Sequence, residues 1–299
     1  SVYSPEKWSS NVHNLPRMRN KDVMISLCDE AQHGLEAELA GLSRAASDEV
    51  PNIINQKKVD AQWVYWYRDA AARASLASFL EKTPLDQATL FNIAPTDKHV
   101  TLAIVLRQTE IWVGLRLAPG AVVDRRNLAT KLGKSWERER ALELIHGLPE
   151  GATVGFENAL ISAADLTLDG LGGYAERLGQ HDPAWQIGHS LSVEDAVDLG
   201  GDLVGVLHGW LAALAPLYRF TAWTRDNDLI EATKQIQEEK AQKRRQATKF
   251  NPGDRVRFIA GLFSGKLGIV QEIDTKAQVK VRVGKMSVVV PGTDLTAAS

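Results

Sequence analysis

The stretch Pro252-Gly253-Asp254-Arg255-Val256-Arg257-Phe258 carries the most regular pattern in this chain of 299 residues. In it, Val256 and Phe258 alternate with Arg255 and Arg257. Successive side chains of a strand point to opposite faces, so the apolar pair would face a core and the arginines would face solvent. The stretch therefore predicts a half-buried β-strand with one cationic face.

Three more short apolar runs follow this strand: Leu267 to Ile273, Val279 to Val283 and Val288 to Val290. A glycine-containing turn precedes the first run, and a polar segment at 274–278 separates it from the second. Runs of this length bounded by turn residues predict strands joined by tight turns. We expect the last strand to end at Pro291, because proline cannot donate a hydrogen bond to a strand ladder.

The residues from Pro252 to Val270 resemble a KOW module, the small SH3-like barrel found in NusG-type elongation factors and several ribosomal proteins. The resemblance rests on Gly261, Phe263 and Gly268, together with the hydrophobic alternation. Gly268 aligns with the glycine that marks the family motif, and we expect a bend between strands there that tolerates no Cβ. The resemblance implies an all-β barrel over residues 250–299 that contacts RNA, the ribosome or RNA polymerase rather than performing catalysis.

NusG-type proteins also place a compact polymerase-binding domain ahead of this module, and residues 1–225 have no recognisable counterpart of it. The polymerase binding that this N-terminal domain provides in NusG-type proteins is therefore not implied for residues 1–225. SH3-like barrels also recur as plain protein-docking or packing elements. A protein–protein adaptor, with the barrel docking on an acidic partner, is accordingly one alternative function.

Charge divides the chain into two unlike parts. From Lys240 to the end there are twelve Lys and Arg against four Asp and Glu, whereas residues 1–239 hold 23 against 33. An acidic body with a basic tail is the pattern expected when one end meets a polyanion. We therefore predict that RNA or DNA phosphates are contacted by the basic side chains of the tail, namely Lys243, Arg244, Arg245, Arg255, Arg257, Lys266, Lys280, Arg282 and Lys285.

Residues 226–249 lie between the two parts and contain no glycine or proline. Asp226 and Asp228 at the start of this segment, and lysines and arginines at its end, suit the two ends of a helix. The segment predicts a charged helical linker between a body at 1–225 and the barrel at 250–299. A solvated linker without a binding role is the alternative.

The composition is typical of a cytoplasmic protein, with 44% hydrophobic residues and one cysteine. No basic stretch followed by an apolar one begins the chain, so no signal peptide is predicted. The longest apolar run, Leu203 to Leu217, is shorter than the roughly 20 residues that span a bilayer, and we predict no membrane segment. Cys28 lies at helical spacing with Met24 and Ala31, which indicates a core residue rather than a nucleophile. The sequence leaves the oligomeric state open.

Residues 1–225 mix helical and strand patterns without a regular strand–helix rhythm, which predicts an α+β body. We expect strands at 59–67, 99–107, 110–117, 153–156 and 185–190, the second and third of which form a hairpin, and a single longer helix across 57–82 is the alternative to the first strand. We expect helices at 20–46, 69–80, 124–132, 136–148 and around Tyr174. A last helix is predicted to begin after Ser192, with Asp195 completing its cap, and to have a wide apolar face made of Leu203, Leu207, Trp210, Leu211 and Leu214.

Signals for catalysis in the body are weak. The sequence Gly188-His189-Ser190-Leu191-Ser192 differs by one residue from the G-x-S-x-G elbow of serine hydrolases, and we expect Ser190 to end a strand and Ser192 to cap a helix instead. The seven histidines have no metal-ligand spacing and no phosphate-binding loop is present, so no metal and no cofactor are predicted. His208, alone on an apolar helix, is expected to be a core histidine with one satisfied nitrogen.

A metal-dependent nuclease is the enzymatic alternative, with the C-terminal module recruiting the substrate. It would need several carboxylates around a cation, and the candidates are Asp124, Glu110, Glu157 and Asp169. The competing interpretation is structural. In that case Asp124 caps the helix that follows it, and the two arginines after it pair with Glu137 or Glu139.

The aromatic cluster Trp63, Tyr65, Trp66 and Tyr67 has the residue types that stack on bases in single-strand binders. Period-two alternation puts Trp66 on the opposite face of the strand from the other three rings. We therefore expect the other three to pack in the core and Trp66 to be free, with Arg68 and Arg73 completing a surface patch.

Overall fold

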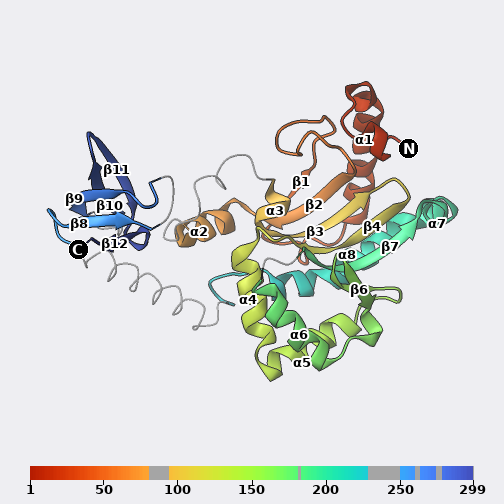
Figure 1. Cartoon of the computed structure of the whole chain (residues 1–299). Coiled ribbons are helices and arrows are strands. Elements are labelled where there is room, and N and C mark those ends of the chain that lie inside the picture. Colours follow the sequence, from red (N-terminus) through yellow and green to blue (C-terminus); the bar gives the residue numbers. More distant parts are fainter. Residues whose placement is uncertain (81–93, 181–182, 228–249, 260–262, 274–277, 299) are drawn as a thin grey trace. The chain divides into compact units, whose positions relative to one another are not determined.

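The computed structural model describes residues 1–80, 94–180, 183–227, 250–259, 263–273 and 278–298. The chain divides into two compact units, Ser1–Leu229, called the body below, and Ile230–Ser299, called the C-terminal unit. Each unit contains one antiparallel sheet, and helices accompany the sheet of the body (Figure 1). The mixed α+β class predicted from the sequence is confirmed. The predicted linker at 226–249 lies almost wholly outside the described residues.

The sheet of the body has seven strands in the order β1-β2-β3-β4-β7-β5-β6. Every neighbouring pair is antiparallel. The strands are β1 Leu42–Ala46, β2 Gln62–Arg68, β3 Val100–Leu106, β4 Glu110–Leu117, β5 Thr153–Phe156, β6 Ala159–Ser162 and β7 Trp185–Ser192. The predicted hairpin is confirmed as β3 and β4, in which Leu106 pairs with Ile111 and Val100 with Leu117. The edge strands β1 and β6 were not predicted.

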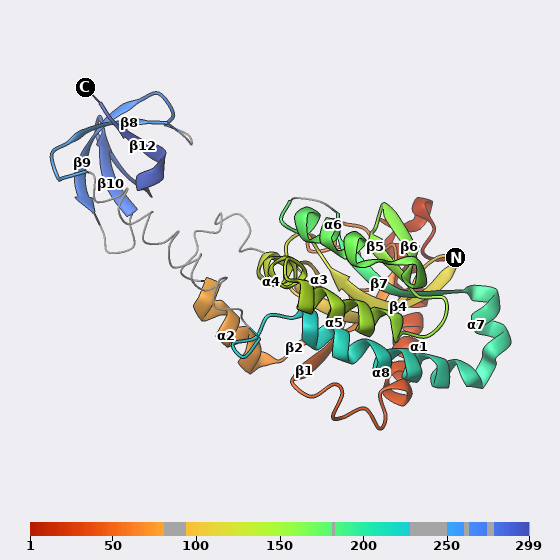
Figure 2. The same cartoon turned by 90° about the horizontal axis from the view of Figure 1, so that it is seen from below.

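The helices of the body are α1 Asn14–Ala31, α2 Ala70–Leu80, α3 Pro95–Lys98, α4 Val122–Leu132, α5 Ser135–His146, α6 Leu168–Leu178, α7 Val193–Leu199 and α8 Leu203–Thr221. Helix α8 packs on β3 and β4, and α1 packs on β2 and on α8. Helices α4, α5 and α6 contact one another, and α4 and α5 also contact α8, as Figure 2 shows from below. One face of the sheet is thereby covered by helices.

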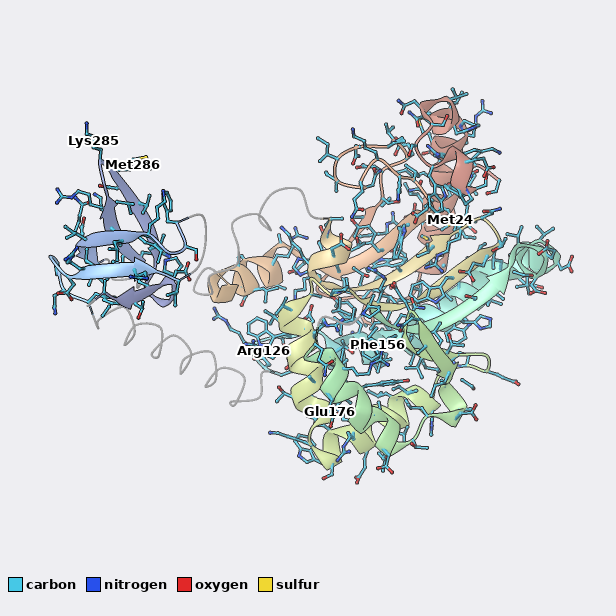
Figure 3. The ribbon with its side chains drawn as sticks, in the orientation of Figure 1. Met24, Arg126, Phe156, Glu176, Lys285 and Met286 are labelled. Carbon is cyan, nitrogen blue, oxygen red and sulfur yellow. The ribbon has the colours of Figure 1, made fainter. Side chains whose placement is uncertain are left out.

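The main hydrophobic core lies between this face and the helices. The sheet contributes Val64, Trp66, Leu102 and Val113, and α8 contributes Leu207, Leu211 and Leu214. All of these side chains are almost completely buried. Phe156, on β5, belongs to the same core and is labelled in Figure 3. Burying aromatic and aliphatic side chains of this size stabilises the body by about 1.5–3 kcal/mol for each one.

The helix predicted over residues 20–46 is wrong in its second half. Helix α1 ends at Ala31, and the chain then turns through Gly34 and Gly41, which have φ values of +85° and +77°. Glycine adopts this left-handed conformation without steric cost, so Gly34 turns the chain away just after the helix and Gly41 turns it into β1. Leu35 and Leu39 nevertheless pack against the core, which explains why the apolar spacing looked helical.

The last helix of the body also differs from the prediction. Ser192 caps α7 as expected, since its Oγ accepts a hydrogen bond of 3.0 Å from the Asp195 backbone N–H. A 3-10 turn at Gly200–Asp202 then separates α7 from α8, and α8 continues through Pro216 to Thr221. Proline removes one backbone hydrogen bond and distorts the helix. The burial of Leu214, Leu217 and Tyr218 around it holds the last turns in place.

Within the described residues, the stretch Val193–Thr221 has the length and apolar composition of a membrane-crossing helix. Half of its most apolar window is buried inside the body. The core side chains of α8 therefore give a structural reason for much of this apolar character.

The C-terminal unit has five strands in the order β11-β10-β9-β8-β12. They are β8 Arg255–Phe258, β9 Leu267–Ile273, β10 Gln278–Val283, β11 Met286–Pro291 and β12 Leu295–Ala297. The first four match the predicted runs. The strand expected to end at Pro291 does so as β11, but it is not the last one, because a 3-10 turn at Gly292–Asp294 leads into β12, which pairs with β8.

Gly268 lies inside β9 rather than at a bend between strands. A Cβ on it would stand 2.3 Å from Val281 Cγ1, 3.0 Å from the Arg282 carbonyl and 3.2 Å from the Phe258 ring. The expectation that no Cβ fits is confirmed, but the reason is the close approach of β10 and of a core ring. Val256, Phe258, Val270, Val279, Val281 and Leu295 are the buried strand residues of this core.

A buried ion pair ties together the elements at one end of the body sheet. Arg68, at the end of β2, binds both carboxylate oxygens of Asp124, with 2.8 Å from Nη1 to Oδ2. Asp124 also accepts from the backbone N–H of Val100 at 3.0 Å and of Trp223 at 2.8 Å. Arg68 Nη2 donates to the Trp223 carbonyl at 2.7 Å. The two side chains therefore join β2, β3, α4 and the segment after α8.

Neither charge of this pair is accessible, since the Arg68 and Asp124 side chains are 3% and 1% exposed. Burial favours loss of the Arg68 proton, but the charge of Asp124 outweighs it and raises the pKa of Arg68. Burial, followed by the nearby Arg68, lowers the pKa of His99 to about 4, so this imidazole is neutral beside the pair. Removing one partner would leave an uncompensated charge in the core.

We expect Asp124→Asn to lower the free energy of unfolding of the body by about 3–5 kcal/mol, because it leaves the Arg68 charge buried without a counter-ion. Urea denaturation followed by tryptophan fluorescence measures this, since all eight tryptophans lie in the body. Glu110→Gln is the matched control. It removes an ion pair to Arg107 whose side chains are 33% and 29% exposed, and we expect it to cost less than about 1 kcal/mol. Equal losses for the two variants would contradict the assigned role of the buried pair.

We expect Gly268→Ala to destabilise the C-terminal unit by about 1–3 kcal/mol, because β9 and β10 must move apart to admit the methyl group. Hydrogen exchange measured by mass spectrometry on peptides from residues 250–299 should show faster exchange, with the tryptophan unfolding curve of the body unchanged. Val289→Ala, at an exposed position of β11, is the control and should leave exchange close to that of the parent chain.

Candidate nucleic-acid interface

The cationic residues predicted from the sequence gather on the outer face of the C-terminal sheet. Six of the nine are described, and all six are exposed: Arg255, Arg257, Lys266, Lys280, Arg282 and Lys285. The other three, Lys243, Arg244 and Arg245, lie outside the described residues, as does Gly261 of the family motif. Phe263 packs on Phe258 with ring centroids 5.7 Å apart, so it supports the core beneath this face.

Strand pairing fixes how these cations are spaced. Arg255 of β8 lies opposite Ile269 of β9, and Ile269 lies opposite Arg282 of β10. Side chains paired in this way share a face, with Cβ atoms of neighbours about 5 Å apart. Two arginines thus flank one aliphatic side chain in a row across three strands. Lys285 stands at the turn between β10 and β11 (Figure 3).

None of the six described cations forms an ion pair with another described residue. The acidic groups beside these cations are Glu272, which lies in register with Lys280, and Asp254, which directly precedes Arg255. The positive charge of this face is therefore largely uncompensated by the described part of the chain. A surface of this kind attracts phosphates by long-range electrostatics and by contact.

Aliphatic side chains lie among the cations. Leu267 is 46% exposed, Ile269 37% and Val289 61%. Ile269 lies between Arg255 and Arg282, and Val289 lies opposite Lys280. The face is thus both cationic and partly apolar, which suits the sugar and base surfaces of a nucleic acid and also the surface of a protein partner.

The predicted aromatic patch of the body is wrong. Trp66 is 2% exposed and lies in the main core, where its indole N–H donates to Gln32 Oε1 at 3.1 Å. Arg68 is buried against Asp124. The alternation along β2 was read correctly, but the helices cover the face that carries Trp66. On the opposite face Tyr65 is buried in a second apolar cluster and the partly buried Trp63 and Tyr67 pack against it, so the expectation that these three rings pack in a core is confirmed.

That opposite face carries a row of aromatic rings with arginines over two of them. The ring centroids of Tyr65 and Tyr67 are 5.6 Å apart, and the guanidinium carbon of Arg73 lies 4.9 Å from the centroid of the Tyr67 ring. Arg116 stands 5.7 Å from the Trp63 ring. A cavity of about 670 Å³ is lined by Trp63 and Tyr65 together with residues of the segments 46–61 and 94–98. The sequence signal for this arrangement was present, since Trp63, Tyr65 and Tyr67 share one alternation.

The charges that line this aromatic cavity cancel. Its cations are Lys58, Lys98 and Arg116, and its carboxylates are Asp48, Asp60 and Asp97. Arg116 is already engaged, donating to Glu157 Oε1 at 3.0 Å and lying 3.9 Å from Asp97. The cavity therefore offers ring surfaces for stacking but no net charge that selects an anion.

The weak hydrolase motif is structural. Ser190 and Ser192 lie in the last three residues of β7, and Ser192 caps α7, both as predicted. His189 Nδ1 lies 3.0 Å from the Gly151 carbonyl, and its ring stacks on Trp210 at 4.9 Å. The motif therefore lies along a strand and not at a sharp strand-to-helix turn that would expose a nucleophile.

The carboxylates considered for a nuclease do not converge. Asp124 is bound to Arg68, Glu110 to Arg107 at one end of β4, and Glu157 to Arg116 toward the other end. Glu110 and Arg116 are six residues apart on β4, which is about 20 Å along a strand. In the described part of the chain, no group of three His, Cys, Asp or Glu side chains has a geometry that could hold a metal ion.

The alternative roles expected for Asp124 and the next arginine are also wrong. Helix α4 has Ala121 at its N-cap, and Asp124 binds Arg68 instead of capping the helix. Arg125 donates to the carbonyls of Leu178 at 3.2 Å, Pro183 at 3.1 Å and Gln180 at 3.3 Å. It thereby holds the end of α6 and the chain that follows against α4. No pattern in the sequence predicts these long-range contacts.

Cys28 is a core residue, as predicted, whereas His208 is only partly buried. Cys28 is fully buried, and burial raises the pKa of its thiol to about 12. His208 Nδ1 lies 3.0 Å from the Ala31 carbonyl, which satisfies one ring nitrogen where α8 meets the end of α1.

No protein-family model matches the chain, and a search of curated proteins finds no match. The functional conclusion below therefore depends on the sequence pattern and on the site geometry.

We expect Cys28 to resist the thiol reagent dithionitrobenzoate in the native protein at about pH 8, because a buried thiol with a pKa of about 12 supplies almost no thiolate. After unfolding in guanidinium chloride, one thiol per chain should react, since the chain has one cysteine. Fast stoichiometric labelling of the native protein would show instead that the α1–sheet core opens readily.

Proposed function

We propose that this protein is a non-enzymatic, nucleic-acid or ribonucleoprotein-associated adaptor that binds RNA through its C-terminal unit. The observation that carries the proposal is the cationic outer face of that unit, where Arg255, Arg257, Lys280 and Arg282 are exposed and form no ion pair with another described residue. The body would then determine which ribonucleoprotein machine, such as a ribosome or RNA polymerase, the protein joins.

The strand arrangement supports an SH3-like, KOW-like barrel for this unit. The last strand, β12, returns to pair with the first, β8, on the side away from β9. Residues from four of the five strands meet in one buried core, with Val288 and Val290 of the fifth packed against it. A short sheet that returns to its own first strand and encloses one core has the geometry of a small, partly closed barrel.

The physical basis of binding is neutralisation of phosphate charge. Each phosphate that a lysine or arginine neutralises releases condensed counterion, so affinity falls linearly with salt on logarithmic axes. The arginines flanking Ile269 add planar guanidinium groups, which bind phosphate oxygens in pairs and also stack on bases. Ile269 and Leu267 between them provide apolar surface for a sugar or base.

The exposed aliphatic side chains also favour a second candidate, a protein–protein adaptor. Leu267, Ile269 and Val289 would be the contact residues in that case, with the cations serving to attract an acidic partner. The two candidates use the same face but rely on different side chains of it. Substitutions of the two kinds therefore separate them.

The nuclease alternative has less support. Three of its four candidate carboxylates, Asp124, Glu110 and Glu157, are engaged by arginines at separate places of the body, and the fourth, Asp169, lies in the first turn of α6. Incubation of the full chain with Mg²⁺ or Mn²⁺ and end-labelled RNA tests it directly, and cleavage would favour it over the proposal.

The test of the proposal is fluorescence anisotropy with a labelled single-stranded RNA of about 20 nucleotides, between about 50 and 300 mM KCl. The parent chain should bind with steep salt dependence. The double variant Arg255→Gln, Arg282→Gln should bind more weakly, and its slope of log affinity against log salt should be smaller by about 1 to 1.5, because two phosphate contacts are lost. The double variant Arg19→Gln, Arg225→Gln, at two exposed arginines of the body, is the matched control and should behave like the parent.

The variant Ile269→Thr, Val289→Thr is the second arm of this test. If RNA is the ligand, it should retain the salt slope of the parent chain, because every cation is still present. The proposal would be wrong if the parent chain did not bind RNA at low salt, or if the arginine double variant bound RNA with the affinity and salt slope of the parent. The protein adaptor would be established instead if the parent chain bound a purified protein partner and no RNA, and the aliphatic variant no longer bound that partner.

A further inference from the structure

A second cavity, of about 270 Å³, opens in the body beside the last turn of α8. Three helices and the segment after α8 contribute its lining, which consists of Lys131, Arg140, Leu144, Pro216, Arg219, Phe220 and Asn227. Its volume lies just below the range of about 300–1,000 Å³ typical of small-molecule sites. It therefore has room for a small anion or for one charged group of a larger molecule.

The charges that line this cavity do not cancel. Lys131, Arg140 and Arg219 are cations from α4, α5 and α8, and none of the lining residues is a carboxylate. This contrasts with the aromatic cavity described above, where three cations face three carboxylates. Lys131 is buried while Arg140 and Arg219 are exposed at the rim, so an anion bound among the three would offset their mutual repulsion.

Lys131 is the clearest sign of an unmet charge. The residue is 3% exposed, and its Nζ donates to the Phe220 carbonyl and lies 4.7 Å from the centroid of the Phe220 ring. An ammonium group has three protons, and this contact uses one of them. Glu137 is the nearest acid to act on Lys131, yet no ion pair joins the two, and burial lowers the pKa of Lys131 to about 8.

The two arginines are held at the rim by different means. Arg219 Nη2 donates to the carbonyls of Ala37 and Glu38, the latter at 2.8 Å, which fixes its guanidinium while other N–H groups remain. Arg140 is exposed, and its guanidinium carbon lies 6.0 Å from the Phe220 centroid. Lys131 and Arg140 thus both approach the ring of Phe220, which brings their charges to one place.

We propose that this cavity of the body is an anion site that accepts a phosphate group, held by Lys131, Arg140 and Arg219. A phosphate dianion matches three cations better than a carboxylate does, because it offers more charge and more acceptor oxygens. Phe220, Leu144 and Pro216 provide the apolar part of the lining beside these cations. The site belongs to the body and does not depend on the function proposed for the C-terminal unit.

Two sources could supply the phosphate: a small phosphorylated metabolite, or a terminal phosphate of RNA. Both present the same group to the three cations. The volume of about 270 Å³ admits the phosphate and little more, so the rest of either molecule would lie outside the cavity.

The test is isothermal titration calorimetry of the full chain with inorganic phosphate at low ionic strength. We expect one saturable site per chain. Arg140→Gln should weaken binding about tenfold or more, because one charge-assisted contact is lost and this exposed position leaves folding intact. Lys131→Met should weaken it further, with tryptophan fluorescence confirming that the variant is folded. Arg19→Gln, on α1 and exposed, is the matched control and should bind as the parent does.

The proposed site would be ruled out if the parent chain did not bind phosphate, or if Arg140→Gln bound phosphate as strongly as the parent. Loss confined to Lys131→Met would also count against it, since a ligand held by three cations must respond to the rim arginine. The Arg255→Gln, Arg282→Gln variant should keep phosphate affinity, so failure here and failure of the RNA proposal are separable. Competition by 5′-phosphorylated RNA, but not by 5′-hydroxyl RNA, would assign the phosphate to a nucleic-acid end, whereas competition by a nucleoside monophosphate alone would assign it to a small molecule.

Discussion

The buried pair of Arg68 and Asp124 is the contact on which the body of this protein depends. Two opposite charges in a core are stable only when each is satisfied, and here the carboxylate accepts from Arg68, Val100 N–H and Trp223 N–H together. The pair thereby fixes the end of β2, the start of β3, the first turn of α4 and the chain leaving α8. The aromatic face of β2 and the cavity at Phe220 lie on elements that it holds together.

The two units use charge in opposite ways. In the body, Arg68 is compensated by a buried carboxylate, and Arg125 is satisfied by backbone carbonyls. In the C-terminal unit, the alternation along β8 leaves Arg255 and Arg257 in solvent over a core of Val256 and Phe258. Cations that hold the body together are thus satisfied within it, while the exposed ones are available to a partner. The cavity lined by Lys131 and Arg140 is an exception within the body, which is why it suggests a ligand.

Sequence patterns worked where local geometry controls the outcome. Period-two alternation located β8, short apolar runs located β9, β10, the β3–β4 hairpin and β7, and the cap at Ser192 located the start of α7. Sequence patterns failed where contacts between distant residues determine the secondary structure. The spacing of Leu35 and Leu39 looked helical because both pack in the core, although Gly34 and Gly41 turn the chain there. Likewise, β1, β6 and β12 are short edge strands whose formation depends on a neighbour already in place.

The sequence by itself determined that β2 has two chemically distinct faces and that the tail is cationic, because alternation and charge are properties of the local chain. Only the tertiary structure decided which face of β2 the helices cover, and it buried Trp66 rather than Trp63. It also decided that Asp124 would meet Arg68, 56 residues away, and that Lys131, Arg140 and Arg219 would share a cavity. Both faces of β2 are apolar enough to be buried, so only packing decides which one the helices cover. Contacts between residues far apart in the sequence produce no periodic pattern, so they too are decided by packing.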